Sequence, residues 1–530
     1  QDVLLKDVVI KFAGDSGDGM QLTGAQFTNN TALLGIDLAT FPDYPAEIRA
    51  PQGTLPGVSG YQIHFSSDKV YTPGDTSDVL VAMNAAALKV NLKTLKMGGI
   101  IIVNSDGFDT KNLRLANYTV NPLEDQSLSN FIVYKIDVTK HTREALADFT
   151  EMGVKERDRA KNMFVLGLIY WLYNRDIETT ISFLKDKFGK KEQILQSNIK
   201  VLKAGYYFGE TAELFTSRYK VDRAQMPKGI YRNIMGNQSL ALGLVAAAKK
   251  SNLTLFLGSY PITPASDILH ELSKYQNFNV KTFQAEDEIA AVCSAIGASY
   301  GGNIGVTTSS GPGIALKAEA IGLAVMLELP LIIINIQRGG PSTGLPTKTE
   351  QSDLLQAYYG RNGECPLPVL ACSSPADCFT MAYEAVKMSI QHMVPVILLS
   401  DGYIANGSEP WCFPQEQDIP EIKYEFKRTL NADEETFLPY KRNEDLVRAW
   451  TIPGTPNLEH RIGGLEKQYD TGAVSYDAEN HQKMVKVRQA KVDRIAEYIP
   501  LQTIESGNDT GEVLVIGWGP MAQLNRLLIP

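Results

Sequence analysis

The chain has few cysteines and histidines, and neither residue type forms a cluster. Its 530 residues include five cysteines and six histidines, and no two cysteines have the C-x-x-C spacing. A scattered, odd-numbered set of cysteines argues against a disulfide scaffold, a zinc site and a cysteine-bound iron–sulfur cluster. We therefore expect no metal site built by this chain alone, and a reducing, cytoplasmic compartment.

Long apolar runs and an excess of positive charge are also missing. The longest apolar stretches, residues 331–336 and 394–399, are much shorter than the roughly 20 residues needed to cross a bilayer. Lysine and arginine together number 51 against 60 aspartates and glutamates, which gives a formal charge of -9. Because nucleic acid is held largely by basic residues, we expect neither a membrane nor nucleic acid as a partner. Any bound phosphate would need a local site.

The length and composition predict several folded domains. At roughly 100 to 200 residues per domain, the chain should contain about three or four. Hydrophobic residues make up 44% and charged residues 21%, which is typical of a folded globular protein. We expect an N-terminal domain, a linker, a second domain, a connecting segment with a long helix, and the start of a C-terminal domain. The predicted ranges are 1–215, 216–235, 236–420, 421–510 and 511–530.

The N-terminal domain shows the alternation of strands and helices that is typical of a parallel α/β sheet. Its first strand, residues 7–13, is followed by a glycine turn and a helix. Further strands are predicted at 79–83 and 99–103, with a helix over 85–95 between them. The domain ends in a tail with three predicted helices, over 163–173, 178–188 and 191–207.

The second domain repeats this alternation with more strongly apolar strands. Strands are predicted over 253–257, 280–283, 304–308, 331–336 and 394–399. The last two are almost wholly apolar, as strands covered on both faces by helices must be. We therefore expect a doubly wound parallel sheet in this domain.

After the second domain the pattern weakens, and two separate elements follow. We expect one long helix over 478–498 and a strand over 512–518 that begins a further α/β unit. One strand and a short helix cannot bury a core. The C-terminal α/β domain therefore looks incomplete, and we expect the sequence to omit residues at this end.

Ligands bind at the carboxyl ends of the strands in such sheets, and the loops there contain unusual residues. After residues 253–257, Pro261 and Pro264 fix the backbone, so that Tyr260 and Thr263 project from a rigid frame. An equally good alternative is a proline-braced turn in which Thr263 or Ser266 caps the next helix.

Three acids, Glu286, Asp287 and Glu288, follow the next strand and begin a helix. Acids are favoured in a first helical turn by the exposed N–H groups, which is the simpler explanation for any one of them. Glu288, however, precedes the apolar residues 289–292. We expect its carboxyl to be desolvated, with a raised pKa, and able to exchange a proton with a nitrogen heterocycle.

Two further loops combine glycines with polar side chains. Ser310 and Gly311 open a strand-to-helix turn that permits close approach by a ligand, although a purely structural turn is as good an explanation. Arg338 follows an apolar strand and begins a loop of glycines and hydroxyls, which suits a carboxylate or a phosphate. The alternative is a structural ion pair of Arg338 with Glu350 or Asp353.

The N-terminal glycine turn has a weaker signal. Gly14, Gly17 and Gly19 have the spacing G-x-x-G-x-G, which differs from the dinucleotide fingerprint G-x-G-x-x-G. Asp15 and Asp18 between them would repel a pyrophosphate. A tight turn is therefore favoured over a dinucleotide site.

Four motifs, in their order along the chain, resemble those of the α subunit of the 2-oxoacid:ferredoxin oxidoreductases. They are Tyr260-Pro261-Ile262-Thr263-Pro264, Glu286-Asp287-Glu288, Ser310-Gly311-Pro312-Gly313 and Gln337-Arg338-Gly339-Gly340-Pro341-Ser342-Thr343-Gly344. The N-terminal domain resembles the γ domain fused ahead of that subunit. Residues 458–467 and 474–481 resemble the 2-oxoglutarate-type branch, so the resemblance covers nearly the whole chain.

The resemblance implies a thiamine diphosphate enzyme in which this chain supplies the pyrimidine-binding domain and the start of a transketolase-like C-terminal domain. A β subunit would supply the domain that binds the diphosphate and magnesium, and a 4Fe-4S cluster, in a dimer of heterodimers. The implied reaction is the coenzyme A-dependent oxidative decarboxylation of a 2-oxoacid, foremost 2-oxoglutarate to succinyl-CoA, with electrons passed to ferredoxin. Two alternatives stay open: a transketolase-like thiamine enzyme without a redox partner, and a non-catalytic scaffold that docks the β subunit.

The resemblance also implies residue roles. Glu288 matches the glutamate that lies against the aminopyrimidine ring, and Glu286 is the alternative for that role. Thr263 and Tyr260 would lie beside the reacting carbon, and Arg338 with Thr343 would hold the substrate carboxylate. Further cofactor contacts would come from Pro261, Ile262, Ser310 and Gly311. The turn of Gly14, Gly17 and Gly19 would contribute to coenzyme A binding or to a subunit contact. The group that reads a distal carboxylate is not placed.

Overall fold

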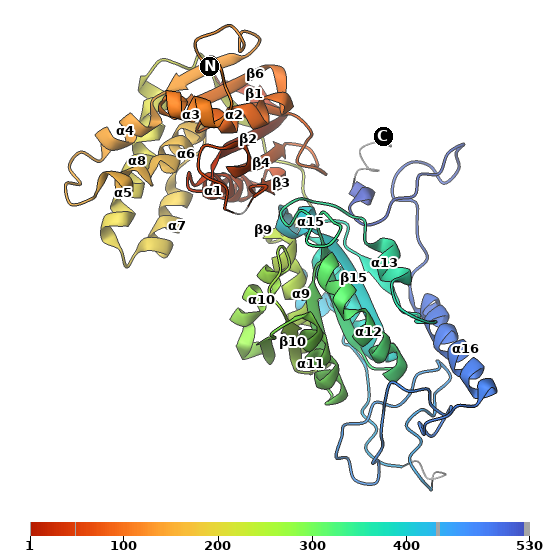
Figure 1. The fold of residues 1–530 in the computed structure, drawn as a ribbon. Helices are drawn as coiled ribbons and strands as arrows, with labels where there is room; N and C mark the ends of the chain where they lie inside the picture. The colour runs from red at the N-terminus through yellow and green to blue at the C-terminus, as the bar shows by residue number, and fades with distance from the viewer. Residues whose placement is uncertain (1, 48, 431–434, 524–530) are drawn as a thin grey trace. The chain divides into compact units, whose positions relative to one another are not determined.

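The computed structural model describes residues 2–47, 49–430 and 435–523 (Figure 1). Strands and helices alternate along most of this length, as the sequence predicts for an α/β protein. No helix in the described ranges combines the length and the apolar character that spanning a bilayer requires.

The chain forms two compact units. The first contains residues 1–233 together with 407–413, and the second contains residues 234–406 and 414–530. The boundary at residue 233 falls within the predicted linker. The short return of the chain to the first unit interrupts the predicted second domain near its end.

A six-stranded mixed sheet forms the centre of the first unit. Its strand order is β3-β4-β2-β5-β6-β7. The predicted strands β2, β5 and β6 are present and parallel, and β4, which the sequence does not predict, pairs antiparallel with both β2 and β3. The strands are β2 (Asp7–Asp15), β3 (Asp37–Asp43), β4 (Val58–Ser66), β5 (Ser77–Ala82), β6 (Leu95–Asn104) and β7 (Ile132–Ile136).

Helices pack around this sheet and close its core. Phe27 of α1 is fully buried and has ring contacts with Phe65, Tyr170 and Tyr173. The three helices predicted for the tail of this unit are confirmed as α6, α7 and α8. The helices are α1 (Met20–Leu33), α2 (Ala85–Asn91), α3 (Thr110–Leu115), α4 (Val138–Ala145), α5 (Val154–Asp158), α6 (Lys161–Leu172), α7 (Glu178–Phe188) and α8 (Glu192–Thr211).

Two glycines let α6 and α8 approach each other at backbone distance. A Cβ added at Gly205 would lie 1.9 Å from the carbonyl oxygen of Phe164, and one at Gly167 would lie 2.0 Å from that of Leu202. We expect Gly205→Ala to lower the free energy of unfolding by about 1–3 kcal/mol, because the backbones must separate. Denaturant titration of the full chain measures this change.

Gly322→Ala in the second unit is the matched control, because Gly322 also lies within a helix and a Cβ there would meet nothing within 4 Å. This change should stabilise by about 0.5–1 kcal/mol, since alanine is the better helix former. Equal unfolding midpoints for the two variants would contradict the close-packing argument.

Residues 216–235, the predicted linker, contain two short strands. β8 (Arg218–Val221) pairs in parallel with β1 (Asp2–Leu5). β9 (Tyr231–Met235) pairs with β16 (Ser408–Cys412). Strand partners far away in the sequence order this polar stretch, and no local pattern identifies such partners.

A six-stranded parallel sheet forms the centre of the second unit, which confirms the predicted doubly wound fold. Its order is β11-β10-β12-β13-β15-β14, and every neighbouring pair is parallel. The side chains of β13 and β15 are buried along their whole length. The strands are β10 (Leu255–Ser259), β11 (Val280–Gln284), β12 (Ile304–Ser309), β13 (Leu331–Gln337), β14 (Val369–Ala371) and β15 (Pro395–Asp401).

Helices cover both faces of this sheet. α11 packs against α12, β10 and β12, while α9 packs against α10 and α14. Right-handed crossovers place these two groups on opposite faces. The helices are α9 (Gly236–Ser251), α10 (Ser266–Leu272), α11 (Glu288–Tyr300), α12 (Gly311–Leu327), α13 (Leu354–Tyr359), α14 (Asp377–His392) and α15 (Gly402–Asn406).

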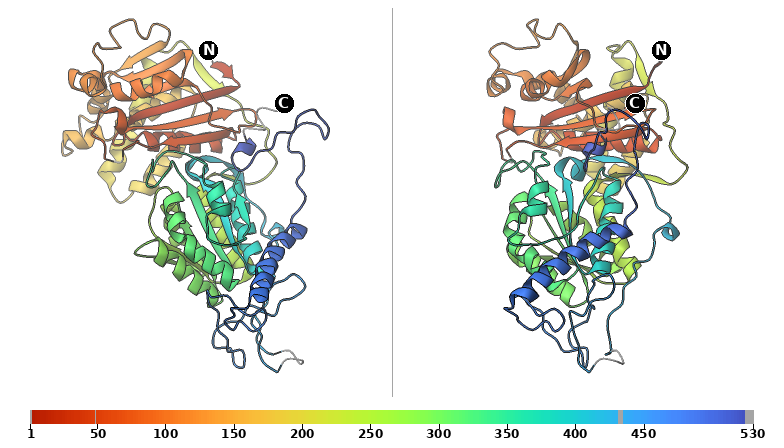
Figure 2. Two further views of the ribbon diagram at one scale, coloured as in Figure 1. Left: turned by 45° about the vertical axis from the view of Figure 1, so that its right-hand side comes forward. Right: turned by 90° about the vertical axis from the view of Figure 1, so that its right-hand side faces the viewer.

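The predicted long helix near the C-terminus is confirmed as α16 (Ala478–Arg494), continued by a 3-10 turn over Ile495–Tyr498. Figure 2 shows it, in blue, along the second unit. The strand predicted over residues 512–518 is wrong: these residues form no strand, and Ile516 is 85% exposed. An apolar stretch becomes a strand only when another strand pairs with it, and none in the described part does so here.

Candidate functional site

The predicted site loops meet at one edge of the second sheet. β11, β10, β12 and β13 are consecutive parallel neighbours, so the loops that follow them leave the sheet at the same carboxyl edge. These loops contain Tyr260 and Thr263, the acids 286–288, Ser310, and Arg338. The structure thus brings together the residues that the sequence places at four separate strand ends.

Glu288 lies over the turn between β12 and α12. A Cβ added at Gly313 would lie 2.9 Å from Cγ of Glu288 and 1.9 Å from Oγ of Ser309. Only glycine permits this approach. The hydroxyls of Ser309 and Ser310 are buried, and neither has a hydrogen-bond partner among the described residues. Because buried hydroxyls are normally satisfied, these two mark a place where an additional group fits beside Glu288.

The three acids of the α11 entrance have different environments. Asp287 caps the helix, because its carboxylate accepts a hydrogen bond from the amide of Ala290 at 2.7 Å. Glu286 is exposed, whereas Glu288 is half-buried. Of the apolar residues after Glu288, Ile289 is 50% exposed, whereas Ala291 and Val292 turn into the core. The expected desolvation of the Glu288 carboxyl stays a prediction.

Arg338 connects two of the loops. Arg338 is 7% exposed, and its guanidinium donates to the carbonyl oxygens of Thr263 at 2.8 Å and Thr343 at 3.0 Å, while its Nε has no partner in the part of the chain that the structure describes. Burial lowers the pKa of this guanidinium. The group is therefore fixed at the edge of the sheet and retains a donor for a ligand.

The structural ion pair considered for Arg338 is absent from the described residues. Glu350 accepts a hydrogen bond from the amide of Gly340 at 2.7 Å. Asp353 accepts one from the side-chain amide of Asn335 at 2.9 Å. Both candidate acids are thus engaged elsewhere, which favours the ligand-binding explanation for Arg338.

The loop after β10 presents Tyr260, Pro261 and Thr263 at the surface, while Ile262 packs against the core. The capping alternative is wrong, because the N-cap of α10 is Ala265 and no side chain bonds there. The peptide bond between Thr263 and Pro264 is cis.

Four polar residues near these strand ends are not among the site residues predicted from the sequence. Asn335 and Gln337 bond to Asp353, whose pKa is raised by burial. Asp401 is fully buried, burial raises its pKa to about 6, and it accepts a hydrogen bond from the amide of Tyr403 at 2.7 Å. One feature of the sequence could have indicated them: Asn335 is a polar residue within the otherwise apolar strand β13.

The N-terminal glycine turn is confirmed as a tight turn of the first unit. Gly19 has a φ of 74°, and a Cβ there would lie 2.8 Å from Asn162. Asp18 accepts a hydrogen bond from the amide of Asp15 at 2.8 Å and lies 2.7 Å from the ammonium of Lys161. The carboxylate of Asp18 thus holds the turn itself, while that of Asp15 accepts a hydrogen bond from the amide of Gly53 at 2.9 Å.

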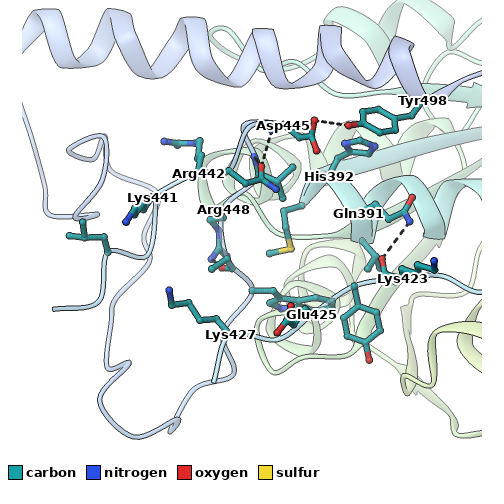
Figure 3. Close-up of a pocket in the computed structure, with 18 of the residues that line it drawn as sticks. Gln391, His392, Lys423, Glu425, Lys427, Lys441, Arg442, Asp445, Arg448 and Tyr498 are labelled. Atoms are coloured by element: carbon teal, nitrogen blue, oxygen red, sulfur yellow. Dashed lines mark hydrogen bonds between the residues drawn. The ribbon is translucent and has the colours of Figure 1, made fainter. Parts of the chain in front are cut away.

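A pocket of about 590 Å³ lies elsewhere in the second unit (Figure 3). It is lined by the end of α14, by Tyr498, and by parts of residues 423–450, and none of the predicted site residues contributes to it. Two of its basic side chains already have partners in the chain, since Arg442 pairs with Glu328 and Arg448 donates to the carbonyl oxygen of Glu328. The pocket is therefore separate from the candidate site.

Comparisons with known families cover both units. Residues 247–480 match the family described as "Pyruvate flavodoxin/ferredoxin oxidoreductase, thiamine diP-bdg". Residues 9–208 match the family described as "Pyruvate ferredoxin/flavodoxin oxidoreductase". The first match contains all of the loops at the carboxyl edge of the second sheet.

Individual relatives cover nearly the whole chain. The 2-oxoglutarate oxidoreductase subunit KorA of Mycobacterium tuberculosis is 55% identical over 518 residues, which are 97% of this chain and 78% of that protein. The 2-oxoacid:ferredoxin oxidoreductase 1 subunit alpha of Aeropyrum pernix is 27% identical, over 97% of this chain and 83% of that protein. A solved structure of the 2-oxoglutarate:ferredoxin oxidoreductase from Magnetococcus marinus, with 2-oxoglutarate, coenzyme A and succinyl-CoA bound, matches with a TM-score of 0.83 at 31% identity. It covers 99% of this chain and 85% of that chain.

Proposed function

Because this chain belongs to the 2-oxoacid:ferredoxin oxidoreductase family, we propose that it converts 2-oxoglutarate and coenzyme A to succinyl-CoA and CO2 together with a partner subunit. Two electrons leave the substrate and reduce two ferredoxins, one electron each. The Mycobacterium relative bears the 2-oxoglutarate name, and the Magnetococcus structure contains the corresponding substrate and product. These similarities support 2-oxoglutarate over other 2-oxoacids.

The observation that carries the proposal is the shared edge at which Glu288, two unpartnered serine hydroxyls and Arg338 lie. These groups fit the pyrimidine side of thiamine diphosphate, because a carboxyl can hold a proton at a ring nitrogen and hydroxyls can bond an amino group. When bound, thiamine diphosphate supplies the electron sink that makes loss of CO2 from a 2-oxoacid possible. We assign the diphosphate and magnesium to a β subunit, as the resemblance of the loop motifs implies.

Among the acids, geometry favours Glu288 as the group that holds and moves the proton. Its Cγ lies over Gly313 and beside Ser309, whereas Glu286 is exposed. We assign Ser310 and Gly311 to the same ring contact. Pro261 and Ile262 would shape the loop against the ring.

The substrate would lie on the other side of this edge. Thr263 and Tyr260 present hydroxyl groups at the surface, beside the guanidinium that Thr263 helps to hold. Arg338 with Thr343 would bind the carboxylate next to the oxo group, since a planar guanidinium supplies paired donors.

Arg338→Lys should lower kcat/KM for 2-oxoglutarate about 10- to 100-fold, mainly by raising KM. A lysine ammonium cannot hold both carbonyl oxygens and still offer paired donors to a carboxylate. Steady-state kinetics of the assembled enzyme measures this change. Arg361→Lys is the matched control, because Arg361 also donates to backbone carbonyls of this unit but lies outside the site. An unchanged KM in Arg338→Lys would contradict the assignment.

The remaining parts of the enzyme lie outside this chain in our proposal. We assign the 4Fe-4S cluster to the β subunit, the electron acceptor to ferredoxin, and the assembly to a dimer of heterodimers in the cytoplasm. The turn of Gly14, Gly17 and Gly19 would serve coenzyme A binding or a subunit contact. Of its two acids, Asp18 pairs with Lys161, and Asp15 accepts a hydrogen bond from the amide of Gly53.

Purification of the untagged partner with this chain, followed by assays with several 2-oxoacids, tests the proposal. We expect acyl-CoA formation and ferredoxin reduction, both dependent on coenzyme A, with the highest kcat/KM for 2-oxoglutarate. A preference for pyruvate would overturn the substrate assignment. Absence of an iron–sulfur charge-transfer band from an active complex would favour the transketolase-like alternative.

A further inference from the structure

The carboxylate of Asp353 is directed away from the helix that it precedes. Asp353 is the N-cap residue of α13, a position at which aspartate normally accepts a hydrogen bond from an amide of the first turn. Among the described helices, every other aspartate at an N-cap makes this bond, namely Asp109, Asp137, Asp287 and Asp477. The side chain of Asp353 makes no such bond to the described part of α13. Another interaction therefore determines where this carboxylate points.

Strand β13 holds Asp353 instead. The side-chain amide of Asn335 donates to Oδ2 of Asp353 at 2.9 Å, and the backbone amide of Asp353 donates to Oε1 of Gln337 at 2.9 Å. Asn335 is fully buried. Because a carboxylate only accepts hydrogen bonds, the bond to Asp353 fixes which end of the Asn335 amide faces it. Two bonds to β13 thus keep Asp353 at the carboxyl edge of the sheet.

The carboxylate held in this way lies against the first turn of α12. A Cβ added at Gly311 would lie 2.9 Å from Oδ2 of Asp353 and 3.4 Å from its Oδ1. Two residues further along, Gly313 is approached in the same way by Cγ of Glu288. The first turn of α12 therefore admits two carboxylates from different loops, one over each glycine. The N–H groups at a helix N-terminus carry partial positive charge, which favours both carboxylates at this place.

The surroundings of Asp353 favour a ligand group that donates hydrogen bonds. Asp353 is half-buried, so a bound molecule can reach its carboxylate. The neighbouring hydroxyl of Ser310 and the side-chain oxygen of Asn335 are buried and have no hydrogen-bond partner within the described ranges. Carboxylate and amide oxygens only accept, and a hydroxyl can accept as well. An amino group of a ligand matches this set of acceptors.

Charged side chains nearby do not pair with Asp353. Arg338 donates to the carbonyl oxygens of Thr263 and Thr343, and Glu350 accepts a hydrogen bond from an amide of its own loop. Among the described residues no cation lies within ion-pair distance of the Asp353 carboxylate. A half-buried carboxylate in this position gains from a further donor, because hydrogen bonds to charged acceptors are the stronger ones.

We propose that Asp353 is a second carboxylate of the cofactor site, which accepts a hydrogen bond from the amino group of the aminopyrimidine ring while Glu288 faces a ring nitrogen. Asn335 is then a positioning residue that directs this carboxylate toward the ring. The inference rests on the proposed function, since it requires thiamine diphosphate as the ligand. The loop after β13 would therefore contact the cofactor as well as the substrate.

Asp353→Asn in the assembled complex, freed of cofactor, tests the inference. We expect the dissociation constant for thiamine diphosphate to rise about 10- to 100-fold, because the bond from an amino group to a charged acceptor is lost. Isothermal titration calorimetry with magnesium present measures this constant without requiring turnover. The comparison ligand is thiamine diphosphate in which hydrogen replaces the amino group of the pyrimidine. It should bind the variant and the unaltered complex nearly equally, since it offers Asp353 no donor.

Asp353→Ala is the second variant, in case the asparagine variant does not assemble. It should show the same selective loss, because alanine cannot accept the bond. An unchanged affinity for thiamine diphosphate in either assembled variant would overturn the inference. An equal loss for both ligands would overturn it too, since this would reveal a structural role for Asp353 and not a contact with the amino group.

Glu350→Gln is the matched control. Glu350 is an acid of the same loop, but it is exposed and accepts a hydrogen bond from the amide of Gly340 at 2.7 Å. Its replacement should leave both dissociation constants unchanged, and a selective loss there would refute the assignment to Asp353.

The inference and the proposed function fail separately in this experiment. If the unaltered complex did not bind thiamine diphosphate, the proposed function would be refuted. Binding by the unaltered complex without a selective loss in the Asp353 variants would refute only the inference.

Discussion

Glu288→Gln should lower kcat of the assembled enzyme about 10²- to 10⁴-fold while the complex still forms. Glutamine has the same shape but neither accepts nor releases a proton at this position, and removal of a general acid–base group typically costs this much. The half-buried side chain lies over Gly313 without a charged partner in contact, so the amide can occupy the same space. Turnover of 2-oxoglutarate, measured beside the co-purification yield of the β subunit, gives both quantities.

Glu286→Gln is the control for this variant. Glu286 belongs to the same loop, but it is exposed. We expect its kcat within about twofold of the unaltered enzyme, since isolated surface changes are usually small. Loss of activity in Glu286→Gln instead would transfer the acid–base role to that residue. Full activity in both variants would support the non-catalytic scaffold.

The sheet of the second unit could be predicted because its pattern is local. Strands such as β13 are apolar along their whole length, and each is followed by a turn and a helix, so the sequence alone indicates a parallel sheet covered on both faces. The carboxyl ends of those strands then define one edge. For this reason the four site loops, with Glu288 and Arg338 among their residues, could be expected to meet there.

The features that the sequence could not predict depend on distant partners. β4 pairs antiparallel with β2 across about 50 residues, and the strands of residues 216–235 depend on the chain's first residues and on β16. The apolar stretch 512–518 has strand character but no strand to pair with. The contact of Glu288 with Gly313 in the first turn of α12 likewise arises only when two helices pack, so the half-burial of Glu288 does not follow from local pattern.

Helix α12 is followed by a buried charge, and this charge is paired. Glu328, the residue directly after α12, is 1% exposed and accepts hydrogen bonds from Arg442 and, at 2.7 Å, from Lys491. Arg442 comes from the irregular segment after the sheet, and Lys491 comes from α16. The Glu328 carboxylate thus bonds to both of these segments and connects them to the end of α12.

The pKa of Glu328 lies below its ordinary value, and this fixes how the stability of the second unit changes with pH. Burial alone would raise its pKa, but Lys491 and Arg442 outweigh burial and lower it to about 2. The pKa of Lys491 is itself lowered, because its own desolvation exceeds its attraction to Glu328. A depressed carboxyl pKa contributes stability above its ordinary value of 4.5, and this contribution is lost as the pH falls toward 2.

Glu328→Gln should therefore lower the free energy of unfolding of the second unit by about 3–5 kcal/mol at neutral pH, because two buried cations lose their counter-charge. Denaturant midpoints of the full chain at several pH values measure the effect. Glu319→Gln is the control, since Glu319 lies exposed on the same helix and should change stability by less than about 0.5 kcal/mol. As the pH falls from 4.5 toward 2, protonation of Glu328 in the unaltered chain removes the same charge that the variant lacks, so the two midpoints should converge. A difference that stays constant over this range would show that the loss comes from packing and not from the charge of Glu328.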